Sequence, residues 1–488
     1  MKYIYRFLIV VALFFSFSCE EKITEINIDP DTAPTAGEAQ LLVGAIGMIG
    51  YNNEVSLNDY SYLWAQYYTW GIGVSLGNQE RFVQQGSDNN RYWEYAYSDC
   101  LIDLTKLVGS ESKAYQGVGK TLKAYVYQGL VDHFGDIPYT EATRGEIDAG
   151  GILTPAFDPA ATVYDSLVVL LDEAIADLAF ADANGLTDVG DDDLIFGGDM
   201  RAWLKFANSL KLRVLLRTSE TDPQGAAIQS LINSGMFIET AADMPAIPFV
   251  DKAGNQNPMY ARREFGVGDF YFASNASLNV LASLNDPRDT VFYAEASIGT
   301  YAGALRGIDQ GTIDDEPFTA AKEEYSTSTP YSYAADNPVV LMSPWEVWFL
   351  RAEADARYGT ADDETTAFAS AISESFSYCG LSSTVATNYT TSLGYAAGDP
   401  LDTKLDLIGV QKWISMNGTQ EDEGWIETRR FDRPASRLFT NGIFQDPPKS
   451  QLAAGEYPST WLYPAIETSL NSKAPAQRKI TDKIFWDN

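Results

Sequence analysis

Apolar residues recur at steps of three and four along much of this chain, a spacing that places them on one face of an α-helix. One series comprises Leu101, Leu104, Leu107 and Val108, and the next comprises Tyr115, Val118, Leu122, Tyr125, Val126 and Leu130. The pattern predicts two amphipathic helices in succession, each of which needs a neighbour to cover its apolar face.

Further stretches have the same helical character, and most of them come in neighbouring pairs. They lie at residues 160–180, 200–218, 224–235, 343–359, 362–378 and 404–430. Paired helices joined by short turns are typical of tetratricopeptide-like units, which stack to share a core. The sequence has no strict 34-residue repeat. We therefore expect a mainly α fold built on a tetratricopeptide-like scaffold of helix pairs.

Residues 236–342 differ in composition, being rich in Gly, Asn, Asp, Pro, Tyr and Thr with few periodic runs of helical length. This composition predicts loops, short strands and small helices, and hence a loop-rich second lobe. We expect one domain at 37–488, with the helical scaffold at 37–235 and 343–488. Because binding residues concentrate on loops held by rigid scaffolds, a ligand site should draw on this lobe and on residues 70–95.

The N-terminus has the pattern of a secretory signal. Lys2 and Arg6 precede a predominantly apolar run at residues 7–17, which is too short to span a bilayer. The run ends at Cys19 with no small-x-small cleavage pattern, so we expect a lipoprotein signal peptide at 1–18 and acylation of Cys19. An ordinary signal peptide with a chance cysteine is the alternative. Residues 19–36 are polar and contain proline, as expected of a lipidated tether.

The charge of the chain limits the classes of partner that it can bind. Removal of residues 1–18 takes away Lys2 and Arg6 and no acidic residue, which leaves 32 Lys and Arg against 67 Asp and Glu, a net charge of −35. Such acidity excludes nucleic acid as a partner and disfavours polyanionic ligands. Neutral glycans and peptides remain open.

The cysteines indicate a fold that rests on its core. Apart from Cys19, only Cys100 and Cys379 occur, far apart and both within helix-like segments. We expect two buried free thiols, with a disulfide between them as the alternative.

The residues that most hydrolases and metalloenzymes require are scarce. His133 is the one histidine, so neither a Ser-His-Asp relay with a spare His nor an HExxH metal site can form. We interpret it as the end of a helix, satisfied by backbone. No phosphate-binding or dinucleotide motif occurs. Asp191, Asp192 and Asp193 lack the spacing of an EF-hand and are expected to form a solvated loop, with a calcium site as the alternative. Asp and Glu residues are so abundant that the sequence does not single out a pair of carboxylates for glycoside hydrolysis.

Short motifs follow one another along the chain in an order that matches a known family. They are NIDPD at 27–31, FGDIPYTEA at 134–142, ANSLKLR at 207–213, DPRD at 286–289, the helix at 346–356, QKW at 411–413 with EDEGWIETRR at 421–430 and Pro434, and WLYP at 461–464 with Glu467 and Asn471. Together they resemble the SusD/RagB family of nutrient-binding outer-membrane lipoproteins. Gly135 can end a helix, Asp136 can accept from nearby amides and Pro138 prevents a restart, so the second motif is structural.

The resemblance implies a function as well as a fold. It implies a helical scaffold with a loop-rich lobe and no catalysis. We expect no cofactor, with calcium as the alternative. The protein would be anchored in the outer membrane, face the cell exterior and act as the lid of a SusC-like TonB-dependent transporter. We expect the conserved-looking charges of Arg351, Glu353, Arg429 and Arg430 to form partly buried pairs between helices.

The cargo is an oligosaccharide in our first hypothesis and a peptide in the alternative, while a surface glycosidase is a remote third. Glycan capture needs aromatic faces together with amide and carboxylate groups. Trp64, Tyr67, Tyr68, Trp93 and Tyr97 sit at helical steps and are expected in the core. The ligand-binding candidates are Trp70, Asn78, Asn90 and Tyr271.

Overall fold

The computed structural model describes residues 36–71, 78–146, 150–264, 271–315, 320–431 and 446–487. Two runs of helices dominate the described residues. The first run comprises α3 (Glu38–Tyr51), α6 (Ile102–Val108), α7 (Lys113–Phe134), α8 (Ala160–Asn184), α9 (Met200–Arg217) and α10 (Gly225–Ser234). The second comprises α14 (Pro344–Tyr358), α15 (Glu364–Tyr378), α16 (Ser383–Leu393), α17 (Leu401–Met416) and α18 (Glu421–Arg430).

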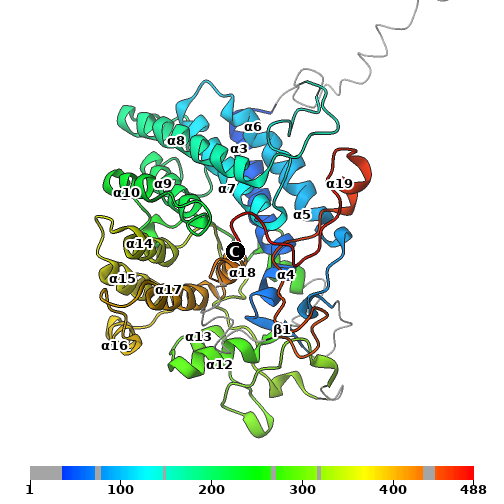
Figure 1. The fold of residues 1–488 in the computed structure, drawn as a ribbon, viewed down its shortest axis with the longest axis vertical. Helices are drawn as coiled ribbons and strands as arrows, with labels where there is room; N and C mark the ends of the chain where they lie inside the picture. Colours follow the sequence, from blue (N-terminus) through cyan, green and yellow to red (C-terminus); the bar gives the residue numbers. More distant parts are fainter. Residues whose placement is uncertain are drawn as a thin grey trace, which may run out of the picture.

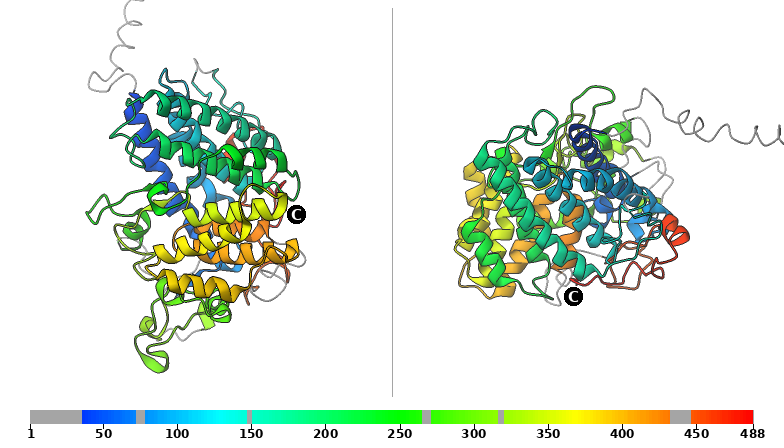
Figure 2. Two further views of the ribbon diagram at one scale, coloured as in Figure 1. Left: turned by 90° about the vertical axis from the view of Figure 1, so that its left-hand side faces the viewer. Right: turned by 90° about the horizontal axis from the view of Figure 1, so that it is seen from above.

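The long helices stack in order down one side of the molecule, from α8 through α9 and α14 to α15 and α17 (Figure 1). The turned view in Figure 2 shows them as successive layers, with a green, loop-rich part of the chain below them. The prediction of a mainly α fold with tetratricopeptide-like helix pairs is confirmed.

Polar residues define where these helices begin. Asp199 accepts hydrogen bonds from two backbone N–H groups at the start of α9, and Ser343, Asp363 and Ser382 do the same with one N–H each for α14, α15 and α16. The end of α7 is set by Gly135 at φ +73°, a conformation that favours glycine. The carboxylate of Asp136 then accepts from the backbone N–H of Ala160 at 2.8 Å, which links α7 to the start of α8.

The sequence prediction of one helical stretch at 404–430 is wrong, because the chain turns between α17 and α18. Gly418 adopts φ +82° there, and a Cβ at this position would lie 2.7 Å from the ring of Tyr331. The helices α3 and α16 were not predicted.

Between the two runs, elements are short. They are β2 (Ala246–Ile247), α11 (Pro258–Arg262), β3 (Tyr271–Ala273), α12 (Asn275–Leu284), α13 (Asp289–Phe292) and β4 (Val339–Val340). β2 pairs antiparallel with β4, and β3 with β1 (Tyr68–Trp70) from the N-terminal part. The helix α4 (Asn58–Trp64) lies near β1 and follows a π-helical turn at Asn52–Leu57. A second π-helical turn at Tyr95–Leu101 continues α5 (Asn90–Glu94), and α19 (Ala465–Leu470) packs beside α5.

A single large hydrophobic core extends from Leu41 to Trp486 and crosses both helical runs. It contains the predicted core residues Trp64, Tyr67 and Tyr68, each at most 1 % exposed. Side chains from the two ends of the chain therefore share one interior.

Charged side chains are also buried, where α9, α14, α17 and α18 meet. Glu427 contacts Arg217 at 2.7 Å, Lys412 at 3.0 Å and Arg430 at 2.8 Å. Arg430 also pairs with Glu353 at 2.6 Å. Burial alone would raise the pKa of Glu353, but the charges of Arg430 and Arg357 lower it to about 2.

The four charges singled out in the sequence follow the expected pattern with one exception. Glu353 and Arg430 pair with each other, and Arg351 pairs with Asp362 at 2.6 Å. Arg429 differs, because its guanidinium donates to the backbone oxygens of Asp132 and Ser459 and lies 3.9 Å from the ring centre of Trp425.

Candidate functional site

Trp70 and Tyr271, which are far apart in the sequence, lie opposite each other in the antiparallel pair of β1 and β3. Their rings stack with centroids 4.7 Å apart and planes 24° apart. Tyr271 is 4 % exposed, whereas Trp70 is partly exposed. We call this pair the aromatic platform. The nearly buried ring of Tyr271 thus supports the indole of Trp70, and its own contact with a ligand stays a prediction.

The chain around the platform is shaped by close packing. A Cβ on Gly71 would lie 1.7 Å from the ring of Phe272, so only glycine allows β1 and β3 to approach this closely. Phe272 is fully buried and packs with Ile308, Ile313 and Tyr325 in a small separate core. The strand that carries Tyr271 is therefore held by a packed interior beside the platform.

A buried carboxylate fixes the strand that carries Trp70. Oε2 of Glu80 accepts from the hydroxyl of Thr69 at 2.6 Å and from the backbone N–H of Trp70 at 2.7 Å. Burial raises the pKa of Glu80 to about 7, despite these two hydrogen bonds, which favour the charged form. Glu80 therefore titrates near neutral pH.

This shift predicts how stability changes with pH. Because the pKa is raised on folding from 4.5 to about 7, Glu80 binds its proton more tightly in the folded chain. Its contribution to the free energy of unfolding is largest below pH 4.5 and is lost as the pH rises through 7, by up to about 3 kcal/mol. The free energy of unfolding, measured with urea, should decrease less between pH 5 and pH 8 in Glu80→Gln than it does in the wild type. An equal decrease in both proteins would contradict the assignment.

Further aromatic and cationic groups extend the platform. The guanidinium of Arg263 lies 4.8 Å from the ring centre of Tyr271 and 4.0 Å from that of Tyr333. Tyr333 packs against Tyr260 with centroids 5.1 Å apart, and its hydroxyl donates to the carboxylate of Glu264 at 2.8 Å. Tyr260 and Tyr333 are partly exposed. Together with the platform, they form a row of rings with polar groups at its edge, as glycan capture requires.

Residues 31–464 match a SusD-like family described as starch-binding and associating with the outer membrane. The chain belongs to this SusD-like family. Its sequence has no significant match among curated proteins.

Solved SusD-like structures share the fold over nearly their whole length. A chitin-binding protein aligns with a TM-score of 0.76 and 22 % identity, covering 93 % of this chain and 100 % of that one. A chitin-binding SusD homologue from Flavobacterium johnsoniae aligns with a TM-score of 0.75 and 18 % identity, covering 93 % of this chain and 98 % of that one. A SusD homologue from Bacteroides uniformis aligns with a TM-score of 0.73 and 20 % identity, covering 92 % of this chain and 98 % of that one. At these low sequence identities, the similarity shows a shared fold alone.

In this SusD-like chain the two predicted asparagines lie outside the aromatic platform. Asn78 is exposed, and its Oδ1 accepts from Arg81 at 3.4 Å. Asn90 begins α5 and accepts from the backbone N–H of Ile466 in α19 at 3.1 Å. Figure 1 shows α5 beside α19 and away from β1. Asn90 therefore has a structural contact, and the structure does not bring it to Trp70.

The histidine of the SusD-like chain is sealed in the core. His133 is fully buried; its Nδ1 lies 2.6 Å from the backbone oxygen of Gly129 and its Nε2 lies 2.9 Å from Oδ1 of Asp422. Ser61 donates to the same Asp422 rather than to the histidine. This arrangement lacks the serine–histidine contact of a hydrolase relay.

The Asp run and the cysteines have structural surroundings. The carboxylate of Asp193 accepts from three backbone N–H groups at 195–198 and from the indole of Trp203, and Asp192 accepts from the hydroxyl of Tyr115. Within the described ranges, no three His, Cys, Asp or Glu side chains gather as metal ligands. Cys100 and Cys379 are free thiols. Cys19 lies outside the described residues.

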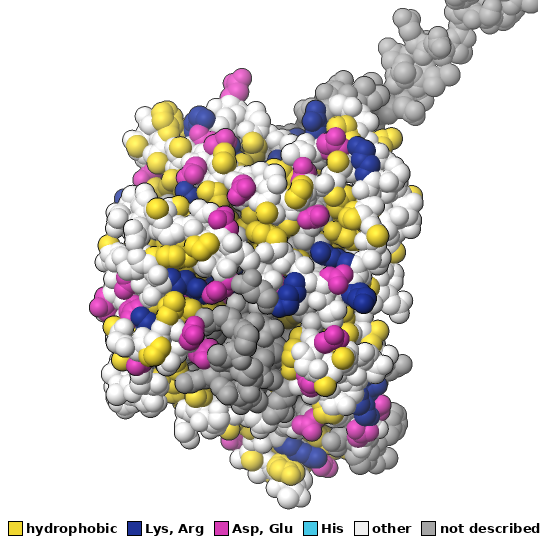
Figure 3. Space-filling model, in the orientation of Figure 1, with side chains coloured by type: hydrophobic (Ala, Val, Ile, Leu, Met, Phe, Trp, Pro, Cys, Tyr) yellow, Lys and Arg dark blue, Asp and Glu magenta, His cyan; other side chains and the backbone are white. Residues whose placement is uncertain are grey.

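The surface shows no gathering of one charge on the face drawn in Figure 3, where Lys and Arg side chains lie scattered among Asp and Glu. No helix in the described part of the chain is long and apolar enough to cross a membrane.

The sequence did not point to Glu80 or Tyr333. Glu80 acts through contacts with Thr69 and Trp70, and Tyr333 through contacts with Arg263 and Glu264, and no local spacing signals such contacts. The one available signal was the tyrosine-rich stretch at 331–333.

Proposed function

We propose that this SusD-like chain is a cell-surface lipoprotein that binds a neutral oligosaccharide at Trp70 and delivers it to a SusC-like TonB-dependent transporter, acting as its lid. The partly exposed indole of Trp70, stacked on buried Tyr271, is the observation that carries the proposal. A rigid aromatic face can cover the apolar side of a sugar ring, while neighbouring polar groups meet its hydroxyls. The family description as starch-binding and the two chitin-binding structures support a glycan.

The attachment to the membrane is part of the proposal. Acylated Cys19 would anchor the chain in the outer membrane facing the exterior, and residues 19–36 would serve as the tether. The helix α3 starts at Glu38, and Figure 1 places it toward the end of the molecule opposite β1. An anchor on that side would leave the aromatic platform accessible. The chain would bind its cargo without cleaving it, in keeping with a family of binding proteins.

Native purification tests the transport role. We would solubilise the outer membrane in mild detergent, purify the tagged lipoprotein and analyse the eluate by mass spectrometry. We expect a TonB-dependent barrel and a bound oligosaccharide. A ladder of short peptides would replace glycan by peptide as the cargo. Recovery of the lipoprotein alone, with neither barrel nor ligand, would contradict its proposed function as a lid.

A further inference from the structure

A polar pocket of about 340 Å³ lies between the π-helical turn Asn52–Leu57, α5 with the short turn before it, and the end of α11. Its volume falls in the range of about 300–1,000 Å³ that is common for small-molecule sites. Among the described residues, Val55 is the one apolar member of its lining. The other side chains supply two guanidinium groups, two carboxylates, two hydroxyls and one amide, so the pocket suits a hydrophilic ligand.

The charges that line the pocket balance each other. Arg91 and Arg262 are positive, whereas Asp88 and Glu94 are negative. The whole chain has a net charge of −33, but this pocket has no local excess of either sign. A neutral ligand with many hydroxyls therefore fits it better than an acidic or a basic one.

Four side chains of the lining make no hydrogen bond or ion pair with the rest of the described chain. They are Ser56, Ser87, Arg91 and Glu94. Arg91 and Glu94 lie three positions apart on α5, a spacing that allows an ion pair, yet they do not form one. The hydroxyl of Ser56 is buried, and buried polar groups are rarely left without a partner. The amide of Asn90 adds N–H donors, because only its oxygen is engaged, by α19.

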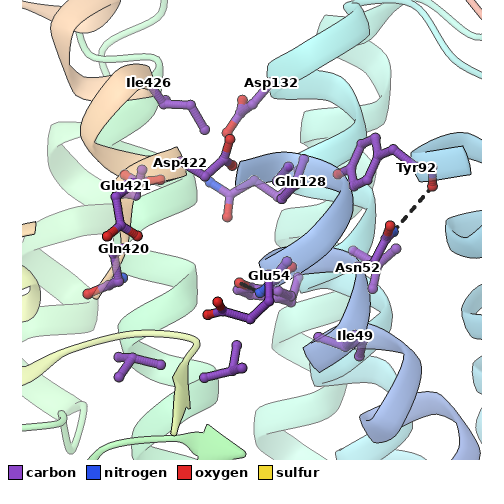
Figure 4. A pocket seen from close by; sticks show the side chains of 18 of the residues that line it. Ile49, Asn52, Glu54, Tyr92, Gln128, Asp132, Gln420, Glu421, Asp422 and Ile426 are labelled. Carbon is purple, nitrogen blue, oxygen red and sulfur yellow. Dashed lines mark hydrogen bonds between the residues drawn. The ribbon is translucent and has the colours of Figure 1, made fainter. Parts of the chain in front are cut away.

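Hydrogen bonds fix the walls of the pocket. The amide of Asn52 donates to the backbone oxygen of Tyr92 at 3.2 Å, which ties the π-helical turn to α5 (Figure 4). The guanidinium of Arg262 donates to the backbone oxygen of Val55 at 3.0 Å, which ties α11 to the same turn. A preformed site loses less conformational freedom when a ligand binds, and π-helical turns often occur at functional sites.

The helix α11 connects this pocket with the aromatic platform. Arg262 lines the pocket, and the guanidinium of the next residue, Arg263, lies 4.8 Å from the ring centre of Tyr271. Tyr260, the last ring of the row that begins at Trp70, also belongs to α11. The row of rings therefore leads from the platform to the helix that bounds the pocket.

We propose that this pocket binds a second sugar unit of the oligosaccharide whose other part lies on Trp70. Arg91 would donate hydrogen bonds to the hydroxyl oxygens of the sugar, Glu94 would accept from its hydroxyls, and the two serines can do both. Hydrogen bonds to charged groups are the strong ones. The inference rests on the proposed function and deepens it, because a protein with two such subsites selects extended glycan chains over short ones.

Titration calorimetry with chitobiose and chitohexaose tests the second subsite. The wild type should bind chitohexaose about 10-fold more tightly than chitobiose, as expected of added hydrogen bonds to charged groups. Arg91→Ala and Glu94→Ala should each bring the ratio of the two affinities close to unity. These substitutions change the net charge in opposite directions, so a loss in both variants indicates direct contacts rather than a general effect of charge.

The matched control is Arg201→Ala, which removes an exposed arginine at the start of α9, outside the pocket. It should keep the ratio of the wild type. An unchanged ratio in Arg91→Ala and Glu94→Ala, or opposite effects of the two, would overturn the second subsite and leave binding at Trp70 in place. If the wild type bound neither oligosaccharide, the proposed function would fail and this inference with it.

Discussion

Replacing Glu427 with alanine should lower the free energy of unfolding by about 3–5 kcal/mol, the typical cost of removing one partner from a buried ion network. Glu427 is fully buried and contacts Arg217, Lys412 and Arg430. Burial alone would raise its pKa, but these three cations hold it well below the usual range. Without the carboxylate, the cations lose a shared partner in the buried interior.

Urea unfolding followed by circular dichroism measures this effect. The matched control is Glu173→Ala in α8, which breaks an ion pair with Lys120 at 2.9 Å, but its carboxylate side chain is 56 % exposed. An exposed pair should contribute less than about 1 kcal/mol. If both variants lost equally little stability, the buried network would not be the support that its geometry indicates.

Replacing Trp70 with alanine should weaken binding of a neutral oligosaccharide about 10- to 100-fold, since buried tryptophans at the centre of an interface commonly dominate its affinity. The substitution removes the only partly exposed ring of the aromatic platform and leaves Tyr271 beneath it. Titration calorimetry with chito- and malto-oligosaccharides measures the loss.

The control for this prediction is Trp348→Ala. Trp348 is also partly exposed, but it lies in α14, stacked 4.0 Å from the guanidinium of Arg351. This variant should bind as the wild type does. Unchanged far-ultraviolet circular dichroism would confirm that Trp70→Ala still folds. Equal affinity of Trp70→Ala and Trp348→Ala for the oligosaccharide would show that Trp70 is not part of the binding site.

The sequence predicts a helix best where its apolar face is continuous. The expected stretches at 160–180 and 200–218 correspond to Ala160–Asn184 and Met200–Arg217. The helix α16 escapes prediction because it is rich in Ser and Thr and buries only Ala386 and Tyr389. Periodicity also fails at Gly418, where a turn splits one expected helix in two, because the chain must pass close to Tyr331.

The sequence could predict which residues belong to the candidate site, but it could not predict how they are arranged in space. Trp70 and Tyr271 are both nominated by their neighbourhoods, yet their pairing depends on a strand register between distant segments. The same reasoning nominates Asn90, which instead contacts the backbone of α19. Glu80 carries no local signal, because its role arises only when its loop folds under β1.

The most direct measurement is a crystal structure of the mature chain with chitohexaose. We expect a sugar ring to lie flat on the indole of Trp70, with its hydroxyls near the polar edge formed by Tyr333 and Glu264. Oligosaccharide bound at another surface, with the indole of Trp70 uncovered, would contradict it.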